Sequence, residues 1–218
     1  MRMRLLLLII TAITIVSCND ARKSETYRLL EDVDSYIEAR PDSALAVLEG
    51  IDVEDLGSRE EKAKYALLMS MALDKNYIDR TDFEVLQPAI DYYEDHGTAT
   101  DKLRTFYYQG RIYYNRGEPE EAMECYIKSL DLGAGSNNVA AKALNYNAQS
   151  LLYYDYFNWE KIVECSLAAA ECYKSLDNTD NYVRMLCRAA EGFSLLGDKE
   201  SLNKYLGECK KLLSKING

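Results

Sequence analysis

The sequence has almost no histidine: His96 is the single one among 218 residues. With one histidine, the chain offers no common zinc ligand set and no clear Ser-His or Cys-His couple for nucleophilic catalysis. His96 stands directly before Gly97 at the expected end of a helix, where a cationic ring interacts well with the helix dipole. We therefore predict a capping role for His96.

Two segments resemble ligand-binding loops but lack the residues that complete them. The GAGSNN segment at 133–138 has no Gly-Lys-Ser/Thr ending, which a phosphate loop requires, and is better explained as a loop between hairpins. The DNTDN segment at 177–181 lacks the glycine and the terminal glutamate of a calcium loop. The sequence thus predicts a protein that is not an enzyme and has no cofactor and no metal site.

No apolar run is long enough to cross a bilayer, which takes about 20 residues. The apolar run at 5–16 follows a basic start with Arg2 and Arg4, which is typical of a secretory signal. It ends in Val16-Ser17-Cys18, which resembles the cleavage box of bacterial lipoproteins, and that resemblance implies a lipid on the sulfur of Cys18. The alternatives are a plain signal peptide and a short signal anchor. We expect residues 1–17 to be a signal peptide and 18–25 to be the lipidated cysteine and a tether.

Positive charge is the minority: 26 Lys and Arg face 36 Asp and Glu, for a net charge of −10. Removal of Arg2 and Arg4 with the signal leaves 24 against 36, or −12. This balance argues against nucleic-acid binding, and it favours solubility and basic ligands.

No Cys-x-x-Cys pair occurs, which argues against a redox motif. The cysteines after Cys18 are odd in number, which argues against a complete disulfide framework; they are Cys125, Cys165, Cys172, Cys187 and Cys209. We predict small buried side chains. A bridge between neighbouring helices stays open as an alternative in an oxidising compartment.

The segment 103–134 carries two helical faces separated by a turn signal. The first face has Phe106, Gly110 and Tyr113, and the second has Ala122, Tyr126 and Ser129. Gly117 fits a left-handed position after the first helix, and Pro119 fits the first turn of the next. This order resembles a tetratricopeptide repeat (TPR), which implies paired antiparallel helices that meet closely at Gly110 and Ala122. Gln109 and Ala134 depart from the usual Leu and Pro.

The chain also repeats with a shift of 40 residues, as from 70 to 110, 150 and 190. Positions that this shift aligns form a column of similar residues. Two columns hold small residues: Ser70, Gly110, Ser150 and Ala190 form the first, and Ala89, Ser129, Ala169 and Cys209 form the second. A third column holds the large residues Leu73, Tyr113, Tyr153 and Phe193. The shift exceeds the usual repeat of about 34 residues, which predicts longer hairpins or connections.

These signals predict an all-α fold over 26–218, an αα-hairpin superhelix like that of TPR proteins, with about five hairpins. The first helix is expected at 26–39, and a shorter one runs from a cap at Asp42 or Ser43 to Gly50. Two more helices should start at the capping boxes Ser58/Glu61 and Thr81/Glu84, and Pro88 should kink the second of these. The later helices are expected at 101–115, 118–132, 139–154, 158–176, 180–196 and 199–216. The last helix carries Lys204, Lys210, Lys211 and Lys215, as expected of a solvated end.

A wider resemblance covers the chain up to about Gly133. The segments ARPDSALAVLEGID, KAKYALLMSMALDKNYID, AIDYYEDHG and FYYQGRIYYNRGE resemble the lipoprotein and sensor-type TPR proteins of Bacteroidetes. That similarity implies a lipid-anchored protein of the cell envelope, in the outer membrane. Longer relatives continue into a membrane-spanning helix and a cytoplasmic part. The sequence up to Gly218 contains neither of these, so we expect any regulatory role to act through another protein.

The family resemblance also implies a ligand groove lined by the first helix of each hairpin. Its expected residues are Arg104, Tyr107, Arg111, Tyr114, Asn147, Leu151, Tyr154, Arg184 and Arg188. Phe106 and Tyr113 are expected inside, with Tyr107, Arg111 and Tyr114 outside. Arg184 and Arg188 match basic positions that clamp a peptide carboxylate in some relatives, although Tyr107 and Ala148 replace the companion Lys and Asn. The leading hypothesis is a scaffold that binds a protein or peptide in this groove; the alternatives are a lipoprotein that binds a glycan or small ligand, and an accessory of a membrane sensor.

Overall fold

The computed structural model describes residues 24–216, so the predicted signal peptide and Cys18 lie outside the described residues. Within this range the chain forms ten α-helices and one 3-10 helix, and no strand. The all-α prediction is confirmed. Packing divides the chain after Ile78 into two compact units, and each is described by itself.

The first unit holds three helices and a short connection. These are α2 (Glu25–Tyr36), α3 (Pro41–Glu49), the 3-10 helix η2 (Val53–Asp55) and α4 (Arg59–Lys75). Helix α4 packs against both α2 and α3, around Leu30, Val33, Ile37, Ala44, Leu48, Leu67 and Leu68. The capping box of Ser58 and Glu61 is present, as predicted. The predicted cap at Asp42 or Ser43 is wrong, because Pro41 already occupies the first helical turn.

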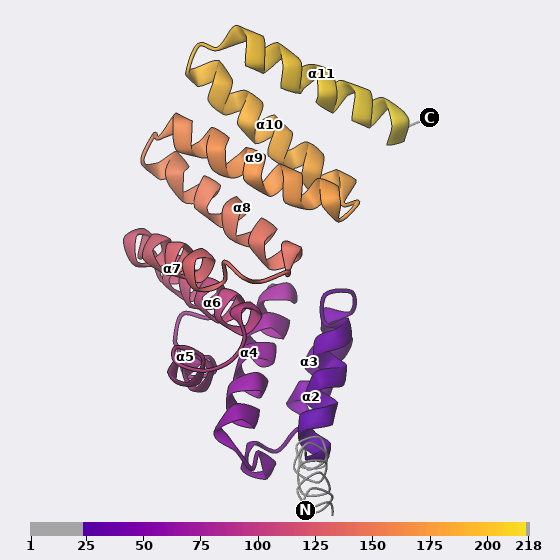
Figure 1. Cartoon of the computed structure of the whole chain (residues 1–218), viewed down its shortest axis with the longest axis vertical. Coiled ribbons are helices and arrows are strands. Elements are labelled where there is room, and N and C mark those ends of the chain that lie inside the picture. Colours follow the sequence, from indigo (N-terminus) through magenta and orange to yellow (C-terminus); the bar gives the residue numbers. More distant parts are fainter. Residues whose placement is uncertain (1–23, 217–218) are drawn as a thin grey trace, which may run out of the picture. The chain divides into compact units, whose positions relative to one another are not determined.

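The second unit holds seven helices, which pack largely against their neighbours along the chain (Figure 1). They are α5 (Gln87–Tyr93), α6 (Ala99–Arg116), α7 (Pro119–Leu132), α8 (Val139–Asp155), α9 (Trp159–Ser175), α10 (Thr179–Leu195) and α11 (Lys199–Ile216). The pairs α6–α7, α8–α9 and α10–α11 are closely packed hairpins. From α6 onward, the predicted helices lie within two residues of the observed ones.

Helices α6 and α7 touch closely at Gly110, as the repeat pattern predicts. A Cβ atom at this position would lie 2.5 Å from a ring carbon of Tyr126 and 3.1 Å from the carbonyl oxygen of Ala122. The turn follows the prediction too, because Gly117 adopts the left-handed conformation at φ 77° and Pro119 begins α7. The sequence therefore identified both the contact and the turn.

The shift of 40 residues reappears in burial and in backbone conformation. Both small columns are buried throughout, and the large column is half-buried. Left-handed residues close the four corresponding helices: Tyr77, Gly117, Phe157 and Gly197. The next residue in each case donates its N–H to a carbonyl of the large column, at Leu73, Tyr113, Tyr153 and Phe193. Each of these helices thus ends in the same hydrogen-bonded turn.

The helices expected on either side of residue 80 fall in different units. Helix α4 belongs to the first unit, whereas α5 belongs to the second and packs against α6. The predicted capping box of Thr81 and Glu84 is wrong, because the Asp82 carboxylate accepts the Glu84 N–H and also pairs with Arg80. Helix α5 starts only at Gln87, with Pro88 in its first turn, so the predicted kink is also wrong.

Candidate functional site

Five of the predicted groove residues meet on one surface formed by α8 and α10, here called the α8–α10 face. They are Asn147, Leu151, Tyr154, Arg184 and Arg188. The spacing of four and three residues along α8, and of four along α10, places each set on a single helix side. Leu151 is 40% exposed and Arg184 is exposed, while the other three are half-buried. This surface is the part of the predicted groove that the structure assembles.

Arg188 links the two helices of this face. Its Nη1 donates to the side-chain oxygen of Asn147 at 2.6 Å and to the hydroxyl of Ser150 at 2.6 Å. Asn147 was predicted as a groove residue and Ser150 as a buried repeat position. These bonds hold the guanidinium in place while leaving it with neutral partners only. This pairing could not be predicted from local sequence patterns, because Arg188 lies 41 residues from Asn147 and 38 from Ser150.

Arg188 forms no direct ion pair with a described carboxylate, although the charge of Glu191 acts on it. Among the described residues, no carboxylate lies within 4.0 Å of Arg188 or of Arg184. Burial lowers the pKa of the Arg188 guanidinium from its ordinary value; Tyr154 and Glu191 oppose this shift, and the nearby charge of Arg184 adds to it. By contrast, Arg104 pairs with Asp101 and Arg111 with Asp79. The α8–α10 face therefore holds two arginines that form no ion pair with a described carboxylate, with Glu191 as the acidic group whose charge acts on Arg188.

Glu191 also lies on α10, where its charge acts on Arg188 while its carboxylate is hydrogen-bonded to a tyrosine. The hydroxyl of Tyr154 donates to the Glu191 carboxylate. Burial, and then this hydrogen bond, raise the pKa of Tyr154 to about 12, so the phenol stays protonated and keeps donating. The bond draws the carboxylate to the end of the face where Tyr154 lies.

A partly exposed aromatic cluster lies at the turn between α8 and α9, here called the aromatic turn. It consists of Tyr154, Tyr156, Phe157 and Trp159. The Trp159 ring lies 6.0 Å from Tyr154 and 5.7 Å from Phe157, edge to face in both pairs. Phe157 is 73% exposed. Its φ of 52° lies in the left-handed region, which is unusual for a residue with a bulky side chain. The equivalent turn positions 117 and 197 hold glycine.

The groove residues on α6 behave differently from the prediction. Arg104 and Tyr107 are 7% and 6% exposed, so the placement of Tyr107 on an open surface is wrong. The reason is that α6 packs against α5, α7 and α8, which cover three of its sides. Arg111 and Tyr114 remain accessible and adjacent, with the guanidinium 5.6 Å from the ring centre. Phe106 is fully buried and Tyr113 half-buried, in line with the expectation that they lie inside.

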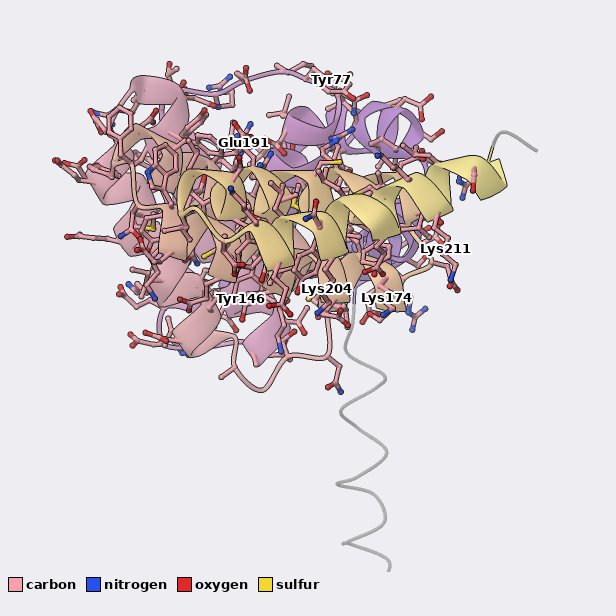
Figure 2. The ribbon with its side chains drawn as sticks, turned by 90° about the horizontal axis from the view of Figure 1, so that it is seen from above. Tyr77, Tyr146, Lys174, Glu191, Lys204 and Lys211 are labelled. Carbon is pink, nitrogen blue, oxygen red and sulfur yellow. The ribbon has the colours of Figure 1, made fainter. Side chains whose placement is uncertain are left out.

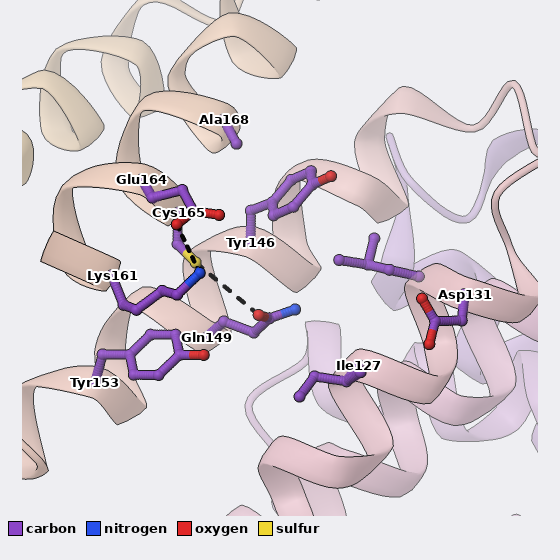
Figure 3. Close-up of a pocket in the computed structure, with 10 residues that line it drawn as sticks. Ile127, Asp131, Tyr146, Gln149, Tyr153, Lys161, Glu164, Cys165 and Ala168 are labelled. Atoms are coloured by element: carbon purple, nitrogen blue, oxygen red, sulfur yellow. Dashed lines mark hydrogen bonds and ion pairs between the residues drawn. The ribbon is translucent and has the colours of Figure 1, made fainter. Parts of the chain in front are cut away.

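A separate pocket of about 280 Å³ opens between α7, α8 and α9 (Figure 3). Tyr146, Gln149 and Tyr153 of α8 line it, together with Lys161 and Cys165 of α9. Lys161 is paired with Glu164 at 2.7 Å. Burial raises the pKa of the Cys165 thiol to about 11, which makes it a poor nucleophile at neutral pH. Sequence reasoning missed this pocket, because its lining residues come from three helices with no shared motif.

The remaining candidates from the sequence have structural positions. His96 contacts the carbonyl oxygen of Tyr92 through Nδ1 at 3.1 Å, at the C-terminal end of α5, as predicted for a cap. Cys125, Cys165 and Cys209 are buried as expected, but Cys187 is exposed and Cys172 is half-buried, so the prediction of small buried side chains is wrong for these two.

Within residues 24–216 there is no group of three or more His, Cys, Asp or Glu that could hold a metal ion. None of the described helices has the length and apolar character needed to cross a membrane. No protein-family model matches the chain, and a search of curated proteins finds no match.

Proposed function

We propose that this protein is a membrane-anchored interaction scaffold of the bacterial cell envelope, attached through a lipid on Cys18. Its hairpins stack as a TPR-like superhelix, and its α8–α10 face binds an acidic segment of a partner protein. The observation that carries the proposal is the pair Arg184 and Arg188, which have no carboxylate within ion-pair distance. Two neighbouring cations that form no ion pair of their own can accept an anionic group of a partner.

The two arginines would bind an anionic segment in different ways. Arg188 is held rigidly by Asn147 and Ser150, so a carboxylate that reaches it meets a pre-oriented donor in a partly desolvated site. Charge-assisted hydrogen bonds of this kind are about twice as strong as neutral ones. Arg184 is exposed and free to close on the ligand. The net negative charge of the whole chain repels anions at a distance, so a bound segment must also make close contacts.

The aromatic turn supplies those contacts. Tyr154 belongs to both the α8–α10 face and the aromatic turn, and its ring contacts Trp159, which contacts Phe157. Tyr, Trp and Arg are the residue types that dominate binding energy at protein interfaces. Phe157 also occupies a backbone conformation that glycine would adopt without strain. An exposed, strained aromatic residue contributes little to the fold, and this favours a binding role.

The repeat supports the superhelix. Turns with the same hydrogen bonds recur every 40 residues, and the small columns are buried in each repeat. In such arrays the first helices of successive hairpins line a continuous surface. Here those helices would be α6, α8 and α10, which makes the α8–α10 face part of that surface.

Charge reversal tests the proposal. In cells that carry the protein, chemical crosslinking should trap a partner with the parent chain and lose it with Arg184→Glu. Arg184 is exposed, so this change should alter folding stability by only about 0.5 kcal/mol. Lys174→Glu, on an exposed lysine of α9, is the matched control and should keep the partner. Equal crosslinking by both variants would contradict binding at this face.

A second function is favoured by the pocket between α7, α8 and α9. The phenol rings of Tyr146 and Tyr153 and the amide of Gln149 line it. Apolar ring faces combined with a few polar groups suit a small neutral ligand such as a monosaccharide. A screen of simple sugars by protein-observed NMR would reveal it. Shifts confined to this pocket, with no effect of Arg184→Glu, would favour this alternative.

A further inference from the structure

Two thiols on neighbouring helices lie close together at the C-terminal hairpin. The sulfur atoms of Cys187 on α10 and Cys209 on α11 are 3.5 Å apart. Cys187 is exposed, whereas Cys209 is 3% exposed and belongs to the buried core around Tyr173, Val183 and Leu186. One thiol can therefore meet a reagent from solvent, while the other can be reached only through the first.

We propose that Cys187 and Cys209 form a reversible disulfide that fastens α11 to α10, made by exchange with a small-molecule disulfide. The Cys187 thiolate attacks one sulfur of that disulfide, forms a mixed disulfide and releases one small thiolate. Cys209 then loses its proton to solvent and attacks the sulfur of Cys187, expelling the second small thiolate. The two protein thiols lose two electrons and two protons, and the small disulfide is reduced to two thiols.

The order of attack follows from the surroundings of each sulfur. Burial raises the pKa of Cys209 to about 12, and its hydrogen bond with Cys187 adds to this. Cys209 is thus almost fully protonated at neutral pH and is a weak first nucleophile. Once Cys187 is in a mixed disulfide, the sulfur that Cys209 must attack is already its neighbour, and proximity compensates for the low thiolate fraction.

The bridge would act on a helix that packs against the rest of the fold through one side. Among the side chains that the structure describes in α11, Cys209 is the single buried one. Further contacts dock the helix: Tyr205 stacks on Phe193 with ring centres 5.4 Å apart, the Glu208 carboxylate accepts from Tyr182 at 2.5 Å, and Leu212 packs partly buried against the core. Lys204 and Lys211 project from α11 into solvent (Figure 2). Such a one-sided terminal helix opens more readily than the core.

The proposal adds to the proposed function and does not depend on the identity of any partner. A covalent link between positions 22 residues apart restricts the opening of α11 through loop entropy. Oxidation would thus add a covalent link to the packing that already holds α11 on α10.

Peptide mapping of the full chain, incubated with oxidised or reduced glutathione, tests the bridge. Trypsin cuts on both sides of Cys187 and of Cys209, which gives MLCR (185–188) and YLGECK (205–210). After oxidation these two peptides should be joined, and dithiothreitol should separate them. Cys187→Ser should abolish the joined species, while Cys172→Ser, a matched change at the half-buried thiol of α9, should leave it intact. A stable glutathione adduct on Cys187 without the joined peptides, or a bridge that involves Cys172, would overturn the proposal.

Hydrogen exchange tests the fastening separately. Oxidation should slow amide exchange in α11 on the order of 100-fold, as expected for closing a loop of this length. The change should vanish in Cys187→Ser, which keeps the buried Cys209 and should still fold. Unchanged exchange in a chain that has formed the bridge would refute the role in holding α11.

Discussion

The contact between α6 and α7 gives the sharpest stability prediction, at Gly110. In the middle of an exposed helix, replacing glycine by alanine stabilises by about 1 kcal/mol. At Gly110 the added Cβ would lie 2.5 and 2.7 Å from two ring carbons of Tyr126, which is 1% exposed and has little room to move. Overpacking of this kind costs about 1–3 kcal/mol. Gly110→Ala should therefore be neutral to destabilising by about 2 kcal/mol, and Gly110→Leu should cost about 3 kcal/mol or more.

Thermal unfolding of the chain from Asn19 onward, followed by circular dichroism, measures this cost. About 1 kcal/mol corresponds to about 2–4 °C in a chain of this size, so Gly110→Leu should lower Tm by at least about 6 °C. Gly207 provides the control, because it lies within α11 and an added Cβ would meet nothing within 4 Å. Gly207→Ala should raise Tm by about 2–4 °C. If Gly110→Ala raised Tm as much as Gly207→Ala, the close contact between α6 and α7 would be refuted.

Three further predictions concern the anchor and the exposed residues. Cys18→Ala should abolish incorporation of labelled fatty acid and release the protein from washed membranes; normal labelling would disprove the lipoprotein assignment. The Tm of Phe157→Gly should be no lower than that of the parent, because relief of about 1–2 kcal/mol of left-handed strain offsets the conformational entropy of glycine in the unfolded chain. Crosslinking of this variant to the partner should nevertheless fall. Full retention of the crosslinked partner would show that Phe157 is not part of the interface. The double change Arg111→Glu, Tyr114→Ala should leave the far-UV circular dichroism nearly intact, since Tyr114 is 41% exposed and surface changes cost about 0.5 kcal/mol each; unfolding would show that both residues are needed for the core.

The hairpins from α6 onward were predictable because their signals are local. Gly117 and Pro119 mark one turn within a few residues of each other, and the helix periods on either side are regular. The small residue at 110 indicated where the partner helix would touch. Because these features depend on residues that are close together in the sequence, they can be predicted from one sequence alone.

The misses have a different origin: each depends on contacts that the local pattern does not contain. Thr81 and Glu84 have capping-box spacing, but Asp82 accepts the Glu84 N–H and pairs with Arg80. Tyr107 carries a polar hydroxyl and was expected on the surface, but it is buried because α5, α7 and α8 pack around α6.

The aromatic turn shows the same limit. Phe157 gives no sequence sign of a left-handed conformation, because the usual sign is glycine. The shift of 40 residues from Gly117 to Phe157 and Gly197 contains that information. The same left-handed turn holds glycine at positions 117 and 197 and an aromatic residue at positions 77 and 157, so the repeat, and not the residue type, marks the conformation.

Site-specific photocrosslinking tests the α8–α10 face most directly. A photoreactive phenylalanine analogue at Leu151, which is 40% exposed in the centre of that face, is compared with the same analogue at Leu206 of α11, which is 38% exposed. In intact cells, the analogue at Leu151 should trap a discrete partner protein that the analogue at Leu206 does not, and adding Arg184→Glu should remove the product. Equal trapping at both positions, or trapping at Leu151 that survives Arg184→Glu, would contradict recognition of an acidic segment by this face.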